Sequence, residues 1–209
     1  MPATEADQES VLRRYAAAAE DAHAELTALD RHSGDGDFGD NLRGGLRAAV
    51  AAFERSGGPA FGVLGTVFLD EVGGTSGPLL GLLFTEIARA LESGADAAAW
   101  AEGAAAGLAA IQRVGEAKVG DRTLVDALAP AVDALRAGGD DAFAAAARAA
   151  AEGAARTAEL RARMGRASYV GDRVKGRPDP GAVGVALLFW ALATAADPAA
   201  DVPSPVPSL

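Results

Sequence analysis

Residues 29–41 read LDRHSGDGDFGDN and separate two segments in which apolar residues recur at helical spacing. The stretch holds Asp30, Asp35 and Asp37 and interleaves them with glycines. Glycine and aspartate are unfavourable inside helices, so one helix should end near the start of this stretch and another should begin near its end. We therefore predict a helix, a loop that carries the carboxylates, and a second helix.

The same helical spacing continues through most of the chain, and no window alternates with a period of two. Alanine, the best helix former, dominates the apolar residues, and only 5% of the residues are aromatic. We therefore predict an all-α fold whose helices approach closely through small side chains. The expected helices span residues 7–28, 40–55, 60–72, 78–92, 95–113, 123–137, 141–163 and 180–195.

The connections between these helices fall into two kinds. SGGP and AGGD are short, as expected between antiparallel neighbours. Four others are glycine-rich and polar, and they follow the first, third, fifth and seventh helices. In an up-and-down bundle alternate connections lie at the same end, so the sequence predicts a site at one mouth of the bundle. Its four segments are LDRHSGDGDFGD, EVGGTSGP, RVGEAKVGDRT and MGRASYVGDRVKGRPDPGA.

Length, composition and charge restrict the class of protein. A chain of 209 residues fits a single domain, residues 1–209, with a proline-rich tail from about residue 197 that is a surface strap or disordered. The absence of cysteine and of a signal-peptide pattern predicts a cytoplasmic protein. The acidic and basic residues number 29 and 19, a negative balance that argues against nucleic acid. Charged residues interrupt every alanine-rich run, so no membrane span is expected.

The crowded carboxylates can lie together only if something neutralises them, and a hard cation with oxygen ligands would do so. A solvated acidic loop is the alternative. An EF-hand calcium loop is excluded, because counting from Asp35 places Asp40 where glycine is needed and Leu46 where glutamate is needed.

The other polar connections suggest a phosphate site. In GGTSGP, Thr75 and Ser76 precede a helix whose free amides could bind phosphate, although the pattern by itself is more often an ordinary helix cap with a flexible lead-in. The P-loop motif is absent. Asp179 and Pro180 also mark a helix start. Arg166 and Arg173 add positive charge, while His23 and His32 are interpreted as structural or solvated, with His32 kept as a minor candidate.

Four segments together carry a family resemblance. LDRHSGDGDFGDN, GGTSGPLLG, GDRTLVDALAP and GRASYVGDRVKGRPDPGA resemble the four signature loops of the dihydroxyacetone kinase L subunit, in order across nearly the whole chain. The resemblance implies an eight-helix antiparallel barrel that binds ADP and two Mg²⁺ in its mouth. It also implies two partners, a substrate-binding K subunit and a phosphocarrier M subunit. The oligomeric state, including a homodimer, stays open.

The resemblance assigns site residues by motif. The Mg²⁺ ligands would be Asp30, Asp35 and Asp37. The nucleotide contacts would be Phe38, Gly39, Asp40, Asn41, Thr75, Ser76, Gly115, Leu124, Arg166, Asp179, Pro180 and Gly181.

One position departs from the pattern. Members linked to the phosphotransferase system usually read GDGDHG, where this chain reads GDGDFG, so Phe38 replaces a histidine beside the phosphates. We expect a kinase subunit in which ADP receives a phosphoryl group and passes it to a hydroxyketone held by the partner. Two alternatives are the nucleotide domain of an ATP-dependent dihydroxyacetone or ketose kinase, and a nucleotide-sensing module without turnover.

Overall fold

The computed structural model describes residues 5–207 and confirms the all-α prediction. Within these residues the only β pairing is an isolated bridge between Glu5 and Asp96. The α-helices are α1 (Gln8–Asp21), α2 (His23–Ser33), α3 (Phe38–Ser56), α4 (Ala60–Asp70), α5 (Ser76–Ala90), α6 (Ala97–Gly115), α7 (Val125–Ala137), α8 (Ala142–Arg156), α9 (Ala167–Val170) and α10 (Pro180–Ala196). Three 3₁₀ turns accompany them, η1 (Leu91–Ser93), η2 (Thr157–Glu159) and η3 (Gly171–Val174).

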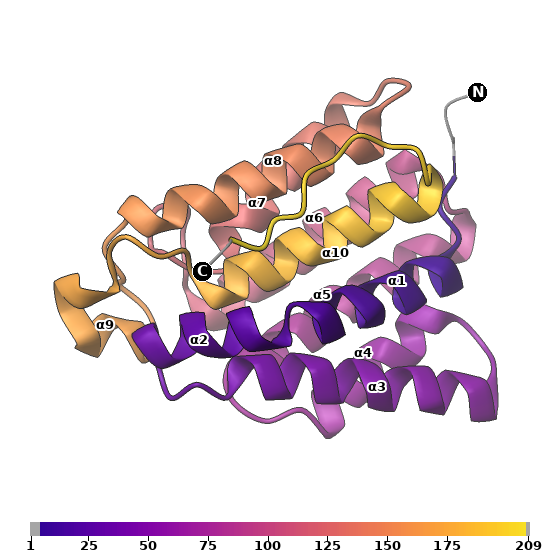
Figure 1. The fold of residues 1–209 in the computed structure, drawn as a ribbon. Helices are drawn as coiled ribbons and strands as arrows, with labels where there is room; N and C mark the ends of the chain where they lie inside the picture. Colours follow the sequence, from indigo (N-terminus) through magenta and orange to yellow (C-terminus); the bar gives the residue numbers. More distant parts are fainter. Residues whose placement is uncertain (1–4, 208–209) are drawn as a thin grey trace.

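The contacts between neighbouring helices form a closed ring, and Figure 1 shows these helices lying side by side along the bundle. The pairs α1 and α3, α3 and α4, α4 and α5, α5 and α6, α6 and α7, and α7 and α8 all pack together. Helix α10 packs against both α8 and α1 and so closes the ring. The core inside the ring includes an aromatic cluster in which Phe84 makes edge contacts with Tyr15, Phe61 and Phe68.

Small residues let the helices approach closely, as the composition predicted. Gly103 and Gly107 lie one turn apart on α6 and face α5. A Cβ at Gly103 would lie 2.6 Å from the Cα of Ile87, and one at Gly107 would lie 2.9 Å from the Cα of Leu83. Because side chains at these positions would force the two backbones apart, these glycines set the spacing between α5 and α6.

Helix α10 is buried on nearly all sides. It contacts α1, α2, α7 and α8, and the tail that follows it runs back along the bundle (Figure 1). Val202 and Val206 of this tail pack against the core, while Pro203 and Pro205 prevent a helix from continuing. The described part of the tail is therefore a surface strap. Its last residues, 208–209, lie outside the described part of the chain.

The bounds of two predicted helices were wrong. The helix expected at 7–28 is two helices, because the chain turns at Ala22 and α2 then continues to Ser33. The helix expected to reach residue 163 ends at Arg156, where the buried Thr157 begins a 3₁₀ turn. The sequence also missed the short helix α9. In each case the local residues permit a helix and tertiary packing decides where it stops.

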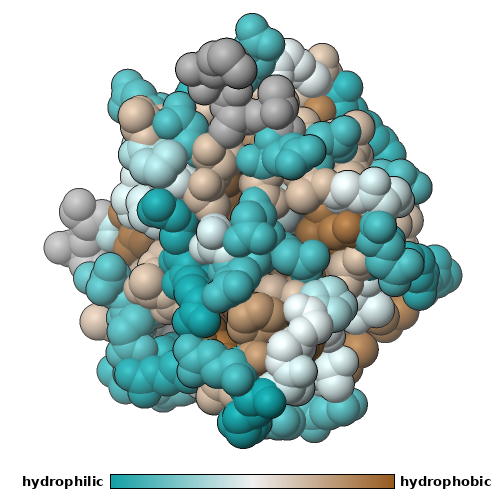
Figure 2. Space-filling model, turned by 90° about the vertical axis from the view of Figure 1, so that its right-hand side faces the viewer, coloured by the Kyte–Doolittle hydropathy of each residue, from teal (hydrophilic) through white to brown (hydrophobic). Residues whose placement is uncertain are grey.

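One end of the bundle has a mostly hydrophilic surface (Figure 2). Figure 2 views the end opposite α9, where hydrophilic side chains cover most of the surface and separate the hydrophobic patches. Among residues 5–207, no helix has the length and apolar character that crossing a membrane requires.

Candidate functional site

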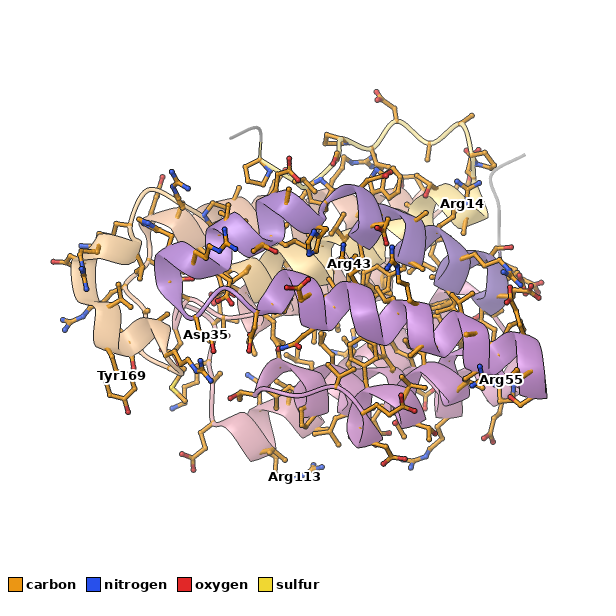
Figure 3. All side chains as sticks on the ribbon, turned by 60° about the horizontal axis from the view of Figure 1, so that its bottom comes forward. Arg14, Asp35, Arg43, Arg55, Arg113 and Tyr169 are labelled. Carbon is orange, nitrogen blue, oxygen red and sulfur yellow. The ribbon has the colours of Figure 1, made fainter. Side chains whose placement is uncertain are left out.

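The four glycine-rich connections line one pocket of about 240 Å³, as the sequence predicted. It opens at the end of the bundle where α9 lies (Figure 1). Figure 3 shows Asp35 and Tyr169 at this end and Arg14 and Arg55 toward the other. Because the helices alternate in direction, α3, α5, α7 and α10 all begin at this mouth. Their free N–H groups and aligned dipoles make the mouth favourable for anions.

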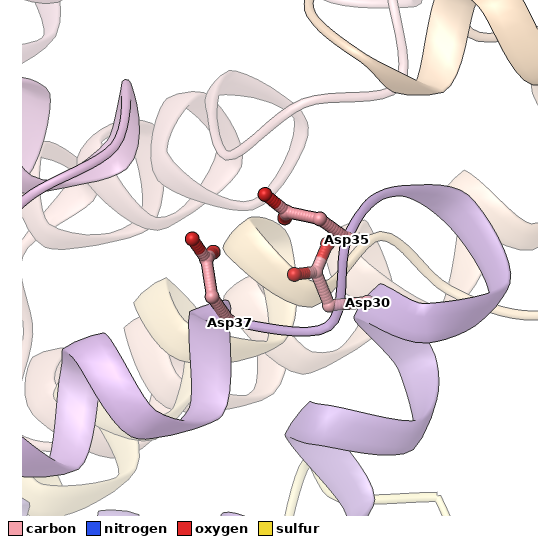
Figure 4. A group of neighbouring side chains, drawn as sticks. All are labelled: Asp30, Asp35 and Asp37. Carbon is pink, nitrogen blue, oxygen red and sulfur yellow. The ribbon is translucent and has the colours of Figure 1, made fainter.

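The three predicted metal ligands lie together (Figure 4). Asp30, Asp35 and Asp37 each offer a carboxylate oxygen, and these oxygens lie within 4.8 Å of one another. The prediction placed Asp30 in the loop, but it lies in the last turn of α2 and is only 9% exposed. Its Oδ2 accepts the N–H groups of Gly36 and Phe38, each at 3.0 Å. Asp30 therefore holds the loop in place as well as facing the pocket.

Two glycines make this arrangement sterically feasible. A Cβ at Gly34 would lie 2.5 Å from Oδ1 of Asp30, so a side chain there would displace the carboxylate. Gly36 has φ of +86°, a conformation that side chains disfavour. The spacing of glycine and aspartate in GDGD thus follows from the geometry of the cluster.

The cluster fits a hard divalent cation. All of its ligand atoms are carboxylate oxygens, the donor type that Mg²⁺ binds. Among residues 5–207, the only cation paired with the cluster is Arg166, which contacts Asp35. Three carboxylates and one guanidinium leave net negative charge inside a small volume, and a bound cation would neutralise it.

Nine of the twelve residues expected to contact a nucleotide line the pocket. They come from all four connections, so the structure brings together segments that are far apart in sequence. They are Phe38, Thr75, Ser76, Gly115, Leu124, Arg166, Asp179, Pro180 and Gly181.

The remaining three, Gly39, Asp40 and Asn41, lie in the first turn of α3 and do not line the pocket. A Cβ at Gly39 would lie 2.3 Å from Oγ1 of Thr27, so Gly39 lets α3 approach α2. The carboxylate of Asp40 turns away to His23, 2.8 Å from its Nε2, and this hydrogen bond is the main reason that the pKa of Asp40 is lowered. Gly39 and Asp40 could therefore contact a phosphate only through their backbone amides. The side-chain amide of Asn41 lies toward the pocket residue Gly74, with Nδ2 3.6 Å from the position that a Cβ there would take.

Phe38 lines the pocket but points into the core. Its side chain is 6% exposed, and its Cζ lies 2.8 Å from the position that a Cβ on Gly184 of α10 would take. The ring thus forms the floor of the pocket. A phenyl ring at this position offers apolar contact and no hydrogen bond to a ligand in the pocket.

Among the charged residues that line the pocket in the described part of the chain, Arg122 is the one that the sequence prediction missed. It lies in the quoted motif GDRTLVDALAP, lines the pocket and is 1% exposed. Burial lowers the pKa of Arg122, and burial also raises the pKa of the neighbouring Asp179 to about 6. A basic residue directly before an apolar helix was the available signal, but nothing local distinguishes it from a surface arginine.

The minor candidates lie elsewhere. His23 pairs with Asp40 on the outside of the bundle, and neither His23, His32 nor Arg173 lines the pocket. The Nε2 atom of His32 is buried and has no hydrogen-bond partner among the described residues. Neither histidine takes part in the carboxylate cluster.

Comparison with known proteins adds independent support. The DAK2 domain matches residues 32–194. The chain is 40% identical over 195 residues to an L-erythrulose 1-kinase of Mycolicibacterium smegmatis, covering 88% of this chain and 34% of the relative. It is 35% identical to a triokinase/FMN cyclase of Rattus norvegicus, covering 80% of this chain and 31% of that protein. The chain thus spans about a third of the length of these relatives.

A shorter relative and a solved structure agree with this match. The ADP-binding subunit DhaL of a PEP-dependent dihydroxyacetone kinase from Listeria innocua is 38% identical, over 80% of this chain and 84% of that protein. The dihydroxyacetone kinase of C. freundii, solved with AMP-PNP and Mg²⁺, superposes with a TM-score of 0.69 at 32% identity, over 92% of this chain and 34% of that one. The fold, the pocket and these matches together show that the chain belongs to the DAK2 domain family.

Proposed function

We propose that this chain is the nucleotide-binding subunit of a dihydroxyacetone-type kinase. In this proposal ADP and two Mg²⁺ occupy the mouth, and a phosphoryl group passes through the nucleotide to a hydroxyketone on a partner subunit. The observation that carries the proposal is that the carboxylate cluster and the N-termini of four helices share one pocket.

The side chains and backbone amides of the pocket would act by holding the metal ions and the phosphate groups in place. Asp30, Asp35 and Asp37 would hold the metal, which when bound neutralises phosphate charge. The amides at the start of α5, beside Thr75 and Ser76, would bind phosphate oxygens. No histidine or cysteine lines the pocket among the described residues, so we assign this chain no covalent step.

The lining of the pocket supports a substrate site outside this domain. Apart from the carboxylate cluster and the helix starts, its polar side chains are Ser33, Arg122 and Arg166, which form no second set to hold a hydroxyketone. The Listeria relative is named as the ADP-binding subunit of a dihydroxyacetone kinase. We therefore propose a K-type substrate subunit and an M-type phosphocarrier as partners.

A second candidate is the nucleotide domain of an ATP-dependent ketose kinase. Phe38 favours it, because a buried phenyl ring cannot donate the hydrogen bond that a histidine there would offer. The deciding experiment mixes the chain with a cognate substrate subunit and supplies either a phosphocarrier system or ATP alone. Repeated turnover with ATP alone would establish the second candidate, and turnover only with the phosphocarrier would establish the first.

The nucleotide site itself is tested by calorimetry. We expect ADP to bind in the presence of Mg²⁺ and to bind far more weakly in EDTA. Binding should also raise the melting temperature, since a ligand at a hundredfold excess over its Kd stabilises the native state by about 2.7 kcal/mol. A chain that shows neither heat of binding nor a melting shift with ADP and Mg²⁺ would refute the proposal.

A further inference from the structure

Two successive residues in the α6–α7 connection hold both ends of the α8–α10 connection. The backbone oxygen of Asp121 accepts the N–H of Arg163 at 3.1 Å, and its Oδ1 lies 3.4 Å from Nη1 of Arg163. Arg122 donates from Nη2 to the carbonyl oxygens of Val174 at 3.2 Å and Arg177 at 3.0 Å. The ten residues between these contacts, 164–173, are therefore anchored at their two feet. We call residues 164–173 the flap.

Apart from its feet, the flap has two packing contacts with the body of the protein. Its η3 part packs against α2, and Met164 packs against the core. Its hydrogen bonds among the described residues are local, and its ion pair across the pocket joins Arg166 to Asp35. Gly165 and Gly171, with φ of +59° and +71°, flank α9, and Tyr169 projects outward and is 91% exposed (Figure 3). Because the hydrogen bonds that join this connection to the α6–α7 connection lie at the two feet, we expect the position of Arg166 to depend on them.

The conformation and the incomplete hydrogen bonding of Arg122 both destabilise the folded protein. The residue has φ of +62°, which is unfavourable by about 1–2 kcal/mol for a residue with a side chain. Its Nε and Nη1 lack hydrogen-bond partners within the described residues, and its nearest carboxylate oxygen, on Asp179, is 3.7 Å away. An incompletely paired buried cation stabilises a fold less than an apolar residue of similar size. Overall stability is therefore a poor explanation for this arginine.

Neighbouring groups hold Arg122 in this conformation. Asp126, in the first turn of α7, accepts the N–H of Gly120 at 2.6 Å and that of Thr123 at 2.8 Å. These two bonds bracket Asp121 and Arg122 and fix the backbone between them. A continuous set of contacts thus runs from α7 through Arg122 to the foot of the flap.

We propose that Arg122 is a positioning residue that fastens the flap so that Arg166 faces the phosphates of the bound nucleotide. Arg122 does not touch the nucleotide in this proposal and acts through Arg166. The inference rests on the proposed nucleotide site, and it adds a residue whose effect can be separated from ligand binding by measurements on the ligand-free protein.

The first test is hydrogen exchange on the ligand-free protein. In Arg122→Met, amides of residues 164–173 should exchange faster, while amides in the middle of α7 and α10 keep their wild-type rates. Arg156→Met, which changes an exposed arginine on α8, is the control. Unchanged exchange in the flap would overturn the proposal. This readout needs no nucleotide, so it stays decisive even if the protein binds no ADP and the proposed function fails.

The second test is a double-mutant cycle on affinity for ADP with Mg²⁺. Arg122→Met should weaken binding roughly tenfold in the wild-type background and have little further effect in Arg166→Ala, since residues that act through one another are not additive. Equal losses in both backgrounds would show that Arg122 acts on the fold and not through Arg166. Arg122→Lys, which keeps the charge and reaches fewer acceptors, should give an intermediate loss. The same cycle with lysine decides the question if the methionine variant does not fold.

Discussion

The mouth of the bundle uses glycine for a purpose that the turns at the far end do not show. At the far end, Gly57, Gly58, Gly138 and Gly139 have φ between +67° and +99°, and a Cβ on any of them would meet nothing within 4 Å. These glycines serve chain reversal, as Gly165 and Gly171 do at the mouth. Gly34, in contrast, has φ of −152°, outside the left-handed region, and is required because the carboxylate of Asp30 occupies the space of a side chain. At the mouth, glycine therefore also makes room for a charged group.

Aspartates show the same contrast. At the far end, Asp96 caps α6 through the N–H of Ala99 and is exposed to solvent. At the mouth, Asp30 and Asp126 each accept two backbone N–H groups and are 9% and 5% exposed. Asp30 and Asp126 at the mouth therefore fix the backbone conformation of the adjoining connections. Substitutions at matched positions of the two ends should separate effects on the affinity for ADP from effects on the free energy of unfolding.

The largest effect is expected from Asp30→Asn. This change removes one charge from the cluster and weakens the acceptor that holds Gly36 and Phe38. Mg²⁺-dependent affinity for ADP should fall more than about a hundredfold, the upper range for groups one shell further from a metal. Calorimetry would measure it, with Asp96→Asn as the control that leaves affinity unchanged. Wild-type affinity in Asp30→Asn would contradict the metal assignment.

The next effect is a pH dependence at Asp179, which has a pKa raised to about 6 by burial. Because the folded protein binds this proton more tightly than the unfolded chain, Asp179 makes stability fall as the pH rises from about 4 to about 6. Asparagine at this position can still cap α10 but has no proton to release. The change in the free energy of unfolding caused by Asp179→Asn should therefore be more favourable at pH 7.5 than at pH 4, by about 2 kcal/mol.

Urea unfolding of the ligand-free protein at the two pH values would measure this difference. Asp96→Asn at the far end makes the same chemical change at an exposed cap and serves as the control. A free-energy difference between wild type and Asp179→Asn that does not change with pH would contradict the prediction.

The smallest effects are expected when one glycine at each end of the bundle is replaced by alanine. Gly34→Ala should weaken ADP binding roughly tenfold by displacing the carboxylate of Asp30. Gly138→Ala should lower the free energy of unfolding by about 1–2 kcal/mol through its positive φ and leave affinity unchanged. Thermal unfolding and calorimetry on both variants test the pair. Loss of affinity in Gly138→Ala, or loss of stability alone in Gly34→Ala, would remove the distinction.

Much of the site could be predicted because its chemistry is local in sequence. Asp30, Asp35 and Asp37 lie within eight positions, so no long-range packing is needed to bring their carboxylates together. The meeting of four connections at one mouth followed from helix alternation alone. Asp179 and Pro180 were recognisable as a helix start because capping depends only on adjacent residues.

What the sequence by itself determined is the set of long helices, the order of their connections and the crowding of the carboxylates, since each depends on spacing along the chain. Only the tertiary structure decided the break at Ala22, the inward turn of Phe38 against Gly184, and the contact of Arg122 with Val174 and Arg177. These features join residues up to 146 positions apart, as in Phe38 and Gly184. Their geometry comes from the packing of α10 and of the α8–α10 connection into the closed ring, which no local pattern encodes.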